Sequence, residues 1–263
     1  MLFNSFAFLV FFPLVCLLYF ILPFKYRWAF LLVASYYFYM NWKPVYAVLI
    51  FTSTAITYLT SLLIERYNNK RKWKRAFLTL SIVLNLGILF LYKYFDFINE
   101  SVAALFGWLH IGWTVPNLDL LLPVGISFYT FQAVGYTIDV YRGDLKAERH
   151  PGIYALFVSF FPQLVAGPIE RARNLLPQFR IQHTVDYDRI ASGLRYMLWG
   201  FFMKLVVADR VSAYVDAVYN NVPQHSGPSF LLATFLFAVQ IYCDFAGYSY
   251  IALGAAKVMG VNL

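Results

Sequence analysis

The chain has 263 residues, of which 61% are hydrophobic, 21% aromatic and only 13% charged, and its mean hydropathy is +0.61. This composition excludes an ordinary soluble domain and predicts an integral membrane protein. The net charge of +8 does not indicate a nucleic-acid partner, because the basic residues lie in short loops between apolar runs, where positive charge holds a loop on the cytoplasmic side.

Apolar runs of about 20 residues predict an all-α fold, a polytopic transmembrane helical bundle. A further Gly-rich apolar segment covers 246–263, and 176–189 is too polar to span and reads as a linker or surface helix. The seven predicted spans are 2–22, 28–40 (short), 44–64, 76–98, 121–141, 190–208 and 229–245.

The first run, 2–22, lacks the basic start and cleavage pattern of a signal peptide, so we expect a retained span. Cys16 and Cys243 both lie in apolar runs, which indicates neither a disulfide framework nor a thiolate metal site. No metal site is expected.

Loop charges predict the topology and a re-entrant segment. The loop before 76–98 carries six basic residues and should be cytoplasmic, whereas the loop 99–120 carries none and should lie outside. The basic residues that mark inside segments are Lys25, Arg27, Arg66, Lys70, Arg71, Lys72, Lys74, Arg75, Arg142, Lys146, Arg149, Arg171, Arg173 and Arg180. Two successive inside segments therefore flank the stretch 152–168.

That stretch contains the motif FFPQLVAGPIE, which is broken by two prolines and a glycine. Irregular backbone at membrane depth is tolerated where protein or a water-filled cavity satisfies it, so 152–168 is predicted to enter and leave by one face and to line an internal site. The alternative is a kinked spanning helix, because about 17 residues can just cross a bilayer.

Polar residues in the span 121–141 predict a face that turns away from lipid. They are Ser127, Tyr129, Thr130, Gln132, Tyr136 and Thr137. Asp139 and Arg142 follow at i,i+3 spacing, and a surface ion pair is the preferred interpretation of them.

Gln163 is an amide at membrane depth beside Pro162, and it could either stabilise the broken turn or meet a substrate. Glu170, Arg171 and Arg173 form either an interfacial cluster or a site for a phosphate-rich donor, since arginine binds phosphate in a bidentate manner.

Asp244 lies in the apolar run QIYCDFAGYS, where an ionised carboxylate is costly unless paired. Tyr248 and Ser249 are the candidate partners, and a structural Asp at a helix break near Gly247 is the alternative. Lys204 and Asp209 are expected to snorkel or cap near the outer interface.

The four histidines, His110, His150, His183 and His225, all fall in predicted loops. A general base for acyl transfer is most often histidine, so no residue of this chain is assigned as catalytic. No GxSxG, Walker, HExxH or cysteine-ligand motif is present either.

Five ordered segments carry a family resemblance. They read FNSFAFLVFFPLVCLLYFILP, LLPVGISFYTFQAVGYTIDVYRG, FVSFFPQLVAGPIERARNLLPQF, KLVVADRVSAYVDAVY and QIYCDFAGYSYIALGAAKVMG. Together they resemble the membrane-bound O-acyltransferase family, specifically the bacterial alginate O-acetylation branch. Residues 1–263 would be a single transmembrane domain, the N-terminal part of a longer one.

The resemblance implies a multi-pass enzyme of the bacterial inner membrane that passes an acyl group, such as acetyl, to hydroxyls of an exported polysaccharide such as alginate. It implies an acyl donor such as acetyl-CoA, no tightly bound cofactor, and a periplasmic or extracellular acetyltransferase partner. The candidate residues for binding or for lining a tunnel are Gln163, Arg171, Asp244 and Tyr248.

The family's histidine lies in a Trp-His motif downstream of the region that resembles QIYCDFAGYSYIALG, so it would fall beyond Leu263, and residues 1–263 alone are expected to be inactive. Two departures concern the surroundings of Asp244: Tyr250 stands where relatives often carry Asp, and Ala246 stands in place of Ser.

Two other functions stay open at this point. A transporter or channel would also use broken helices, although no second copy of FFPQLVAGP is present. The second is that the chain is a non-catalytic membrane fragment.

Overall fold

The computed structural model describes residues 1–109, 112, 115–118, 120–165 and 167–263. His110, Asp119 of the predicted outside loop 99–120, and Ala166 of the motif FFPQLVAGPIE lie outside these residues. Within them all regular secondary structure is helical, and four helices are long and apolar enough to cross a membrane. The predicted all-α, polytopic fold is therefore confirmed.

Most of the described helices follow one another with short connections, whereas the longer segment 109–125 joins α5 to α6. They are α1 (Phe6–Ile21), α2 (Phe24–Met40), α3 (Tyr46–Arg66), α4 (Arg71–Lys93), α5 (Phe95–Trp108), α6 (Ile126–Arg142), α7 (Pro151–Ser159), α8 (Phe161–Leu164), α9 (Ala172–Gln178), α10 (Tyr187–Phe201), the π-helix η1 (Phe202–Ala208), α11 (Asp209–Tyr219), the 3-10 helix η2 (Val222–Gln224) and α12 (Gly227–Met259).

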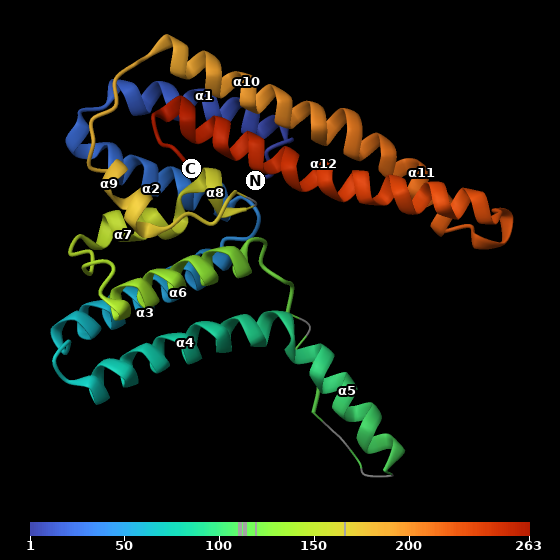
Figure 1. Ribbon diagram of the computed structural model, residues 1–263, viewed down its shortest axis with the longest axis horizontal. Helices are drawn as coiled ribbons and strands as arrows, with labels where there is room; N and C mark the ends of the chain where they lie inside the picture. Colours follow the sequence, from blue (N-terminus) through green and yellow to red (C-terminus); the bar gives the residue numbers. More distant parts are fainter. Residues whose placement is uncertain (110–111, 113–114, 119, 166) are drawn as a thin grey trace.

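The body of the molecule is a bundle in which α3 packs on α4 and α6, and α2 packs on α7 (Figure 1). Its core is strongly aromatic: the rings of Phe11, Phe38 and Phe161 lie within 6 Å of one another, centroid to centroid. The broken segment therefore lies at the centre of the bundle, where α1, α2 and α8 meet.

Two predicted boundaries are wrong. The span 229–245 and most of the segment 246–263 form one continuous helix, α12, which ends at Met259, and the outside loop 99–120 begins with most of α5. In α12 the glycines do not end the helix, because a neighbouring backbone takes the space of the missing side chains. A single helix of 33 residues results.

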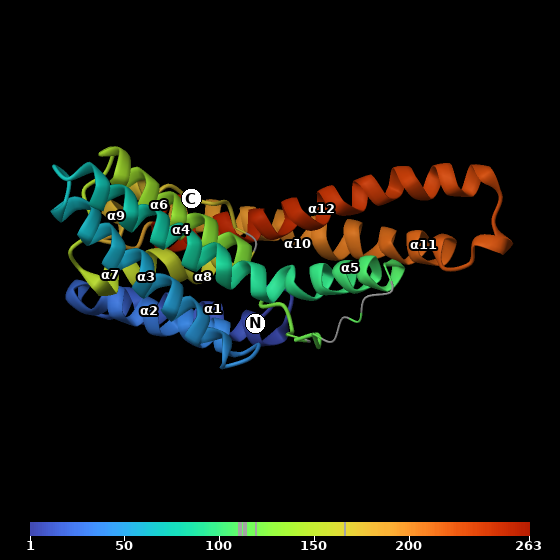
Figure 2. The ribbon, with the colours of Figure 1, turned by 90° about the horizontal axis from the view of Figure 1, so that it is seen from below.

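Two pairs of glycines bring α10 and α12 into close contact. A Cβ on Gly193 would lie 2.8 Å from the carbonyl oxygen of Gly254, and a Cβ on Gly200 would lie 2.6 Å from that of Gly247. Small residues at such interfaces let membrane helices approach closely. The resulting hairpin of α10, η1, α11 and α12 extends well beyond the body (Figure 2).

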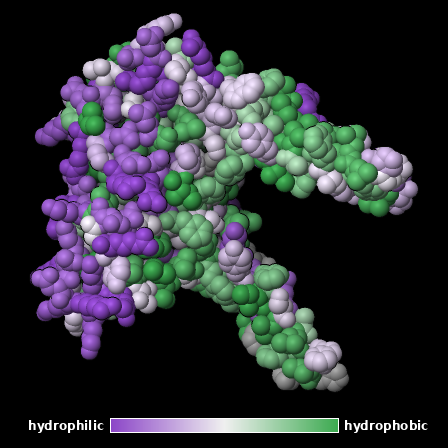
Figure 3. Space-filling model, in the orientation of Figure 1, coloured by the Kyte–Doolittle hydropathy of each residue, from purple (hydrophilic) through white to green (hydrophobic). Residues whose placement is uncertain are grey.

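Hydrophilic side chains gather at one end of the molecule, and the extended helices are mostly hydrophobic (Figure 3). The connections between α1 and α2, between α3 and α4, and between α6 and α7 lie at this end (Figures 1 and 3). We call it the charged end. It holds the basic loops that the sequence predicts to be cytoplasmic.

The segment 152–168 is not a spanning helix. Helix α7 has nine residues, about 14 Å of rise, against a hydrocarbon core of about 30 Å. Phe160, with φ −53° and ψ 111°, breaks the helix, and Pro162 stands in the first turn of α8, where a missing N–H costs little. The short helices are tolerated because their residues are buried in protein.

The chain also returns to the end from which it came. Glu148 precedes α7 and Arg180 follows α9, and Arg180 Nη2 lies 2.5 Å from Glu148 Oε1. This ion pair joins the two ends of the excursion, as the re-entrant prediction requires.

Candidate functional site

A shared carbonyl organises the junction of α7 and α8. The N–H of Phe161 donates to Ser35 Oγ at 3.1 Å instead of bonding within a helix. The carbonyl oxygen of Phe157 is thereby free to accept from Gln132 Nε2 at 2.9 Å and from Gln163 Nε2 at 2.8 Å. Gln163 therefore stabilises the broken turn, which is one of its two predicted roles.

The carbonyl oxygen of the Gln163 side chain, Oε1, takes no part in stabilising the turn. Gln163 is 3% exposed, and within the described part of the chain its Oε1 accepts no hydrogen bond. A buried acceptor without a donor is costly, so it commonly marks a site of water, ligand or chemistry.

A pocket of about 370 Å³ lies between α6 and the segment just before α9. Four charged side chains line it, two basic and two acidic: Arg142, Arg171, Asp139 and Glu170. The remaining lining residues are Phe131, Gln132, Gly135, Tyr136, Ile138, Ile169 and Ala172. Gln132 connects this pocket to the junction of α7 and α8.

The predicted ion pair of Asp139 with Arg142 is not formed: the ion pairs among the described residues do not include it. Glu170 Oε2 instead accepts from the N–H of Arg171 at 3.1 Å and from Asn174 Nδ2 at 3.3 Å. Both guanidinium groups lining the pocket are thus left available for an anionic ligand.

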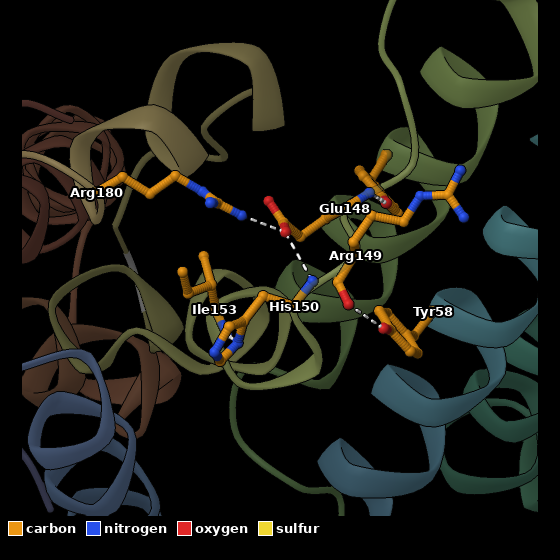
Figure 4. Close-up of polar contacts among 7 residues, drawn as sticks. Tyr58, Glu148, Arg149, His150, Ile153 and Arg180 are labelled. Atoms are coloured by element: carbon orange, nitrogen blue, oxygen red, sulfur yellow. Dashed lines mark hydrogen bonds and ion pairs between the residues drawn. The ribbon is translucent and has the colours of Figure 1, made fainter. Parts of the chain in front are cut away.

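The entrance to the broken segment is held by a polar network (Figure 4). Glu148 Oε1 accepts from Arg180 and from the N–H of His150 at 2.8 Å, and His150 Nδ1 accepts from the N–H of Ile153 at 3.2 Å. Arg149 pairs with Glu65 at 2.7 Å. His150 is therefore the N-cap of α7, which gives it a structural role.

A second polar set lies on the α10–α12 hairpin. Lys204 Nζ is 2.8 Å from Asp209 Oδ1 and 2.5 Å from Asp244 Oδ1, and it lies 5.5 Å from the centroid of the Tyr248 ring. Tyr248 Oη in turn donates to Asn4 Oδ1 at 3.5 Å. Asp244 is thus paired, as expected for a carboxylate in an apolar run, and Lys204 is its partner.

Two expectations about this set are wrong. Lys204 does not snorkel: its side chain is 15% exposed and holds both carboxylates. Asp244 is not at a helix break, since α12 runs through it.

The local reason for the Lys204 arrangement is the π-helix. In η1 the N–H of Asp209 bonds to the carbonyl of Lys204, five residues earlier. An i→i+5 turn places residues 204 and 209 on one face, and such turns are frequent at functional sites. Sequence reasoning missed Lys204 as the centre of this set because residues five positions apart, such as Lys204 and Asp209, lie on different faces of a regular α-helix.

The four candidates thus fall into two sets. Gln163 lies at the α7–α8 junction and Arg171 lines the neighbouring pocket, whereas Asp244 and Tyr248 gather around Lys204. Among the described residues no group of three or more His, Cys, Asp or Glu could hold a metal ion.

Sequence reasoning also missed a polar stripe on α3. Its buried hydroxyl residues include Ser53, Thr57 and Ser61. Ser53 Oγ donates to Asn85 Oδ1 at 2.5 Å, and Thr57 Oγ1 accepts from the fully buried Tyr154 at 2.7 Å. The spacing of four residues between these hydroxyls was the signal in the sequence that could have revealed the stripe. The stripe extends the predicted inward polar face of α6 onto the neighbouring helix α3.

His183 lies in the connection before α10, against the end of α12. Burial lowers its pKa below the usual value, and the charges of Arg189 and Arg27 act in the same direction. A Cβ on Gly260 would lie 2.6 Å from the His183 ring. His183 is therefore a packing residue of the charged end.

Comparison with curated proteins gives a consistent group of relatives, whereas no family model matches the chain. The chain is 36% identical to the probable alginate O-acetylase AlgI of Azotobacter vinelandii over 99% of its own length and 52% of the relative. It is 30% identical to a peptidoglycan O-acetyltransferase of Helicobacter pylori, over 89% of the chain and 48% of that protein.

A more distant match, at 29% identity over 55% of the chain and 36% of the relative, is a teichoic acid D-alanyltransferase of Streptococcus thermophilus. The chain thus spans about half the length of the alginate O-acetylase and the peptidoglycan O-acetyltransferase that it matches. These relatives confirm the resemblance inferred from the five sequence segments.

Proposed function

Since the chain belongs to the membrane-bound O-acyltransferase family, we propose that it serves as an O-acyltransferase that passes an acetyl group to hydroxyls of an exported polysaccharide such as alginate. The observation that carries this proposal is the 36% identity, over 99% of the chain, to a probable alginate O-acetylase. The apolar helices are those of a multi-pass membrane protein, and the proposed location is the bacterial inner membrane.

The donor is proposed to be a phosphate-bearing thioester such as acetyl-CoA, arriving at the charged end. The pocket lined by Arg142 and Arg171 supports this, because guanidinium groups bind phosphate oxygens in a bidentate manner.

The acyl group would then pass the α7–α8 junction. The unpartnered, buried Oε1 of Gln163 supports a role in contact with the substrate, in addition to the structural bond of Nε2. Acyl transfer to a hydroxyl needs a base to remove the hydroxyl proton and donors to stabilise the tetrahedral oxyanion. Lys204, held between two carboxylates, would serve as a fixed positive charge rather than as a base.

We further propose that the general base comes from outside residues 1–263. Two of the described histidines support this, because His150 caps α7 and the His183 ring packs on Gly260. A periplasmic or extracellular acetyltransferase is proposed as the partner that completes transfer to the polymer. Purified residues 1–263 given labelled acetyl-CoA should transfer no label, and transfer by this chain alone would contradict the proposal about the base.

The function itself is tested in the source bacterium. Deleting the gene should remove ester-bound acetyl groups from the exported polysaccharide, and restoring it should return them. Acetyl is measured after mild alkaline release, and polymer yield is the control. Unchanged acetylation with normal yield would contradict the proposed function, and loss of the polymer itself would favour an export role.

A further inference from the structure

A groove on the outer surface of α4 combines three cations with a long apolar floor. It has a volume of about 1070 Å³ and is lined by Arg71, Lys72, Arg75, Ala76, Thr79, Leu80 and Val83. All seven residues are exposed. From Arg71 to Val83 the helix rises about 18 Å, a length comparable to a large part of a lipid acyl chain. The three cations lie at one end of this groove, and the apolar residues occupy the rest.

The three cations have no acidic partner among the described residues. The sequence from 66 to 95 contains no Asp or Glu, and the nearest acid along the chain, Glu65, is paired with Arg149 at 2.7 Å. Lys74, the other cation of this turn, is turned elsewhere: it donates to Asn68 Oδ1 at 2.6 Å and lies 5.1 Å from the centroid of the Tyr141 ring.

The positive charge of the groove indicates which kind of molecule binds there. A second copy of this chain docked through α4 would place like charges together, and a purely apolar helix would leave three cations unpaired. Basic residues next to the cytoplasmic end of a membrane helix attract anionic lipid headgroups, at about 1 kcal/mol for each Lys or Arg. The exposed Trp73 beside them is typical of the membrane interface.

We propose that this groove binds an anionic phospholipid. Its phosphate contacts Arg71, Lys72 and Arg75, and one acyl chain lies along Ala76 to Val83. The site is distinct from the donor pocket on α6 and does not depend on the proposed enzymatic function. It would fix the depth of α4 in the bilayer.

The experiment titrates the purified chain in detergent with short-chain phosphatidylglycerol or phosphatidylcholine, and counts bound lipid by native mass spectrometry. The unaltered chain should retain one phosphatidylglycerol in clear preference. The variant R71Q/K72Q/R75Q should bind it about 100-fold more weakly. The control K25Q/K146Q/R173Q makes the same charge change at exposed positions of the charged end and should keep the preference.

A second arm separates a lipid from a bare phosphate. Val83→Trp fills the apolar floor without changing charge, at a side chain that is 60% exposed and therefore tolerant of change. It should weaken phosphatidylglycerol binding, and free glycerol phosphate should not displace the lipid. Equal binding by the unaltered chain and the triple variant, indifference to Val83→Trp, or displacement by glycerol phosphate would each overturn the proposal.

Discussion

Gly200 on α10 and Gly247 on α12 bring two backbones into contact, so that a Cβ on Gly247 would lie 2.9 Å from the Gly200 carbonyl oxygen. The same contact lies beside Lys204, whose backbone nitrogen would be 3.1 Å from that Cβ. The glycine interface and the ionic cluster are therefore one structural unit.

Gly247→Ala should destabilise the protein by about 1–3 kcal/mol, because backbone atoms cannot move aside for the added methyl group. Unfolding in mixed detergent measures the change. Gly87→Ala, in helix α4 with nothing within 4 Å of the added carbon, is the matched control and should be neutral or stabilising by up to about 1 kcal/mol. Equal effects of the two would contradict the close packing.

Lys204→Met should leave Asp209 and Asp244 facing each other without their cation. Because the carboxylates are 41% and 46% exposed, the expected loss is only about 1 kcal/mol. Asp244→Asn combined with Lys204→Met should cost less than the sum of the single changes. Additive losses in this double-mutant cycle would show that the ion pair contributes nothing.

Arg171→Ala should raise the KM for the acyl donor about tenfold and leave kcat nearly unchanged, since the proposed contact is made equally before and during transfer. Arg171→Lys should recover only part of the loss, because lysine lacks the bidentate geometry. Arg173→Ala is the control, two residues away and not part of the pocket. The assay needs the acetylating membranes of the source bacterium.

His183 should make stability fall on acidification. Its folded-state pKa is lowered, so below about pH 6.5 the unfolded chain binds the proton more readily than the native one. The stability conferred by the neutral ring is present above pH 6.5 and is lost as pH falls toward the folded-state pKa. Unfolding midpoints at pH 7.5 and 5.5 should differ less in His183→Gln, and an unchanged difference would exclude His183 as the cause.

The re-entrant path predicts the sides on which engineered cysteines react. In a chain with Cys16 and Cys243 replaced by alanine, Lys146→Cys and Arg173→Cys should react with an impermeant maleimide from the same side. Reaction from opposite sides would mean that the segment between them crosses the membrane.

Much of this architecture could be predicted from the chain, because hydrophobicity and loop charge act locally. The inward polar face of α6, the short buried helices around Pro162 and the paired state of Asp244 all followed from the cost of polar groups in lipid. Such costs depend on residue type and position in a span.

What could not be predicted depends on long-range packing. The continuity of α12 through Gly247 requires a second helix at contact distance, and Lys204 meets Asp209 only because η1 has a π turn. The acceptor for Gln163 became available because Ser35, 126 positions before Phe161, accepts the hydrogen bond of the Phe161 N–H. No local pattern encodes these relationships.

Helix α12 is longer than a bilayer is thick. Its 33 residues rise about 50 Å, and even at a tilt of about 40° it would cover about 38 Å against a hydrocarbon core of about 30 Å. If the charged end marks the cytoplasmic surface, the turn between α11 and α12, with Asn220, Asn221 and Gln224, must emerge in the opposite compartment. The hairpin would then carry these polar side chains across the bilayer to the side away from the charged end.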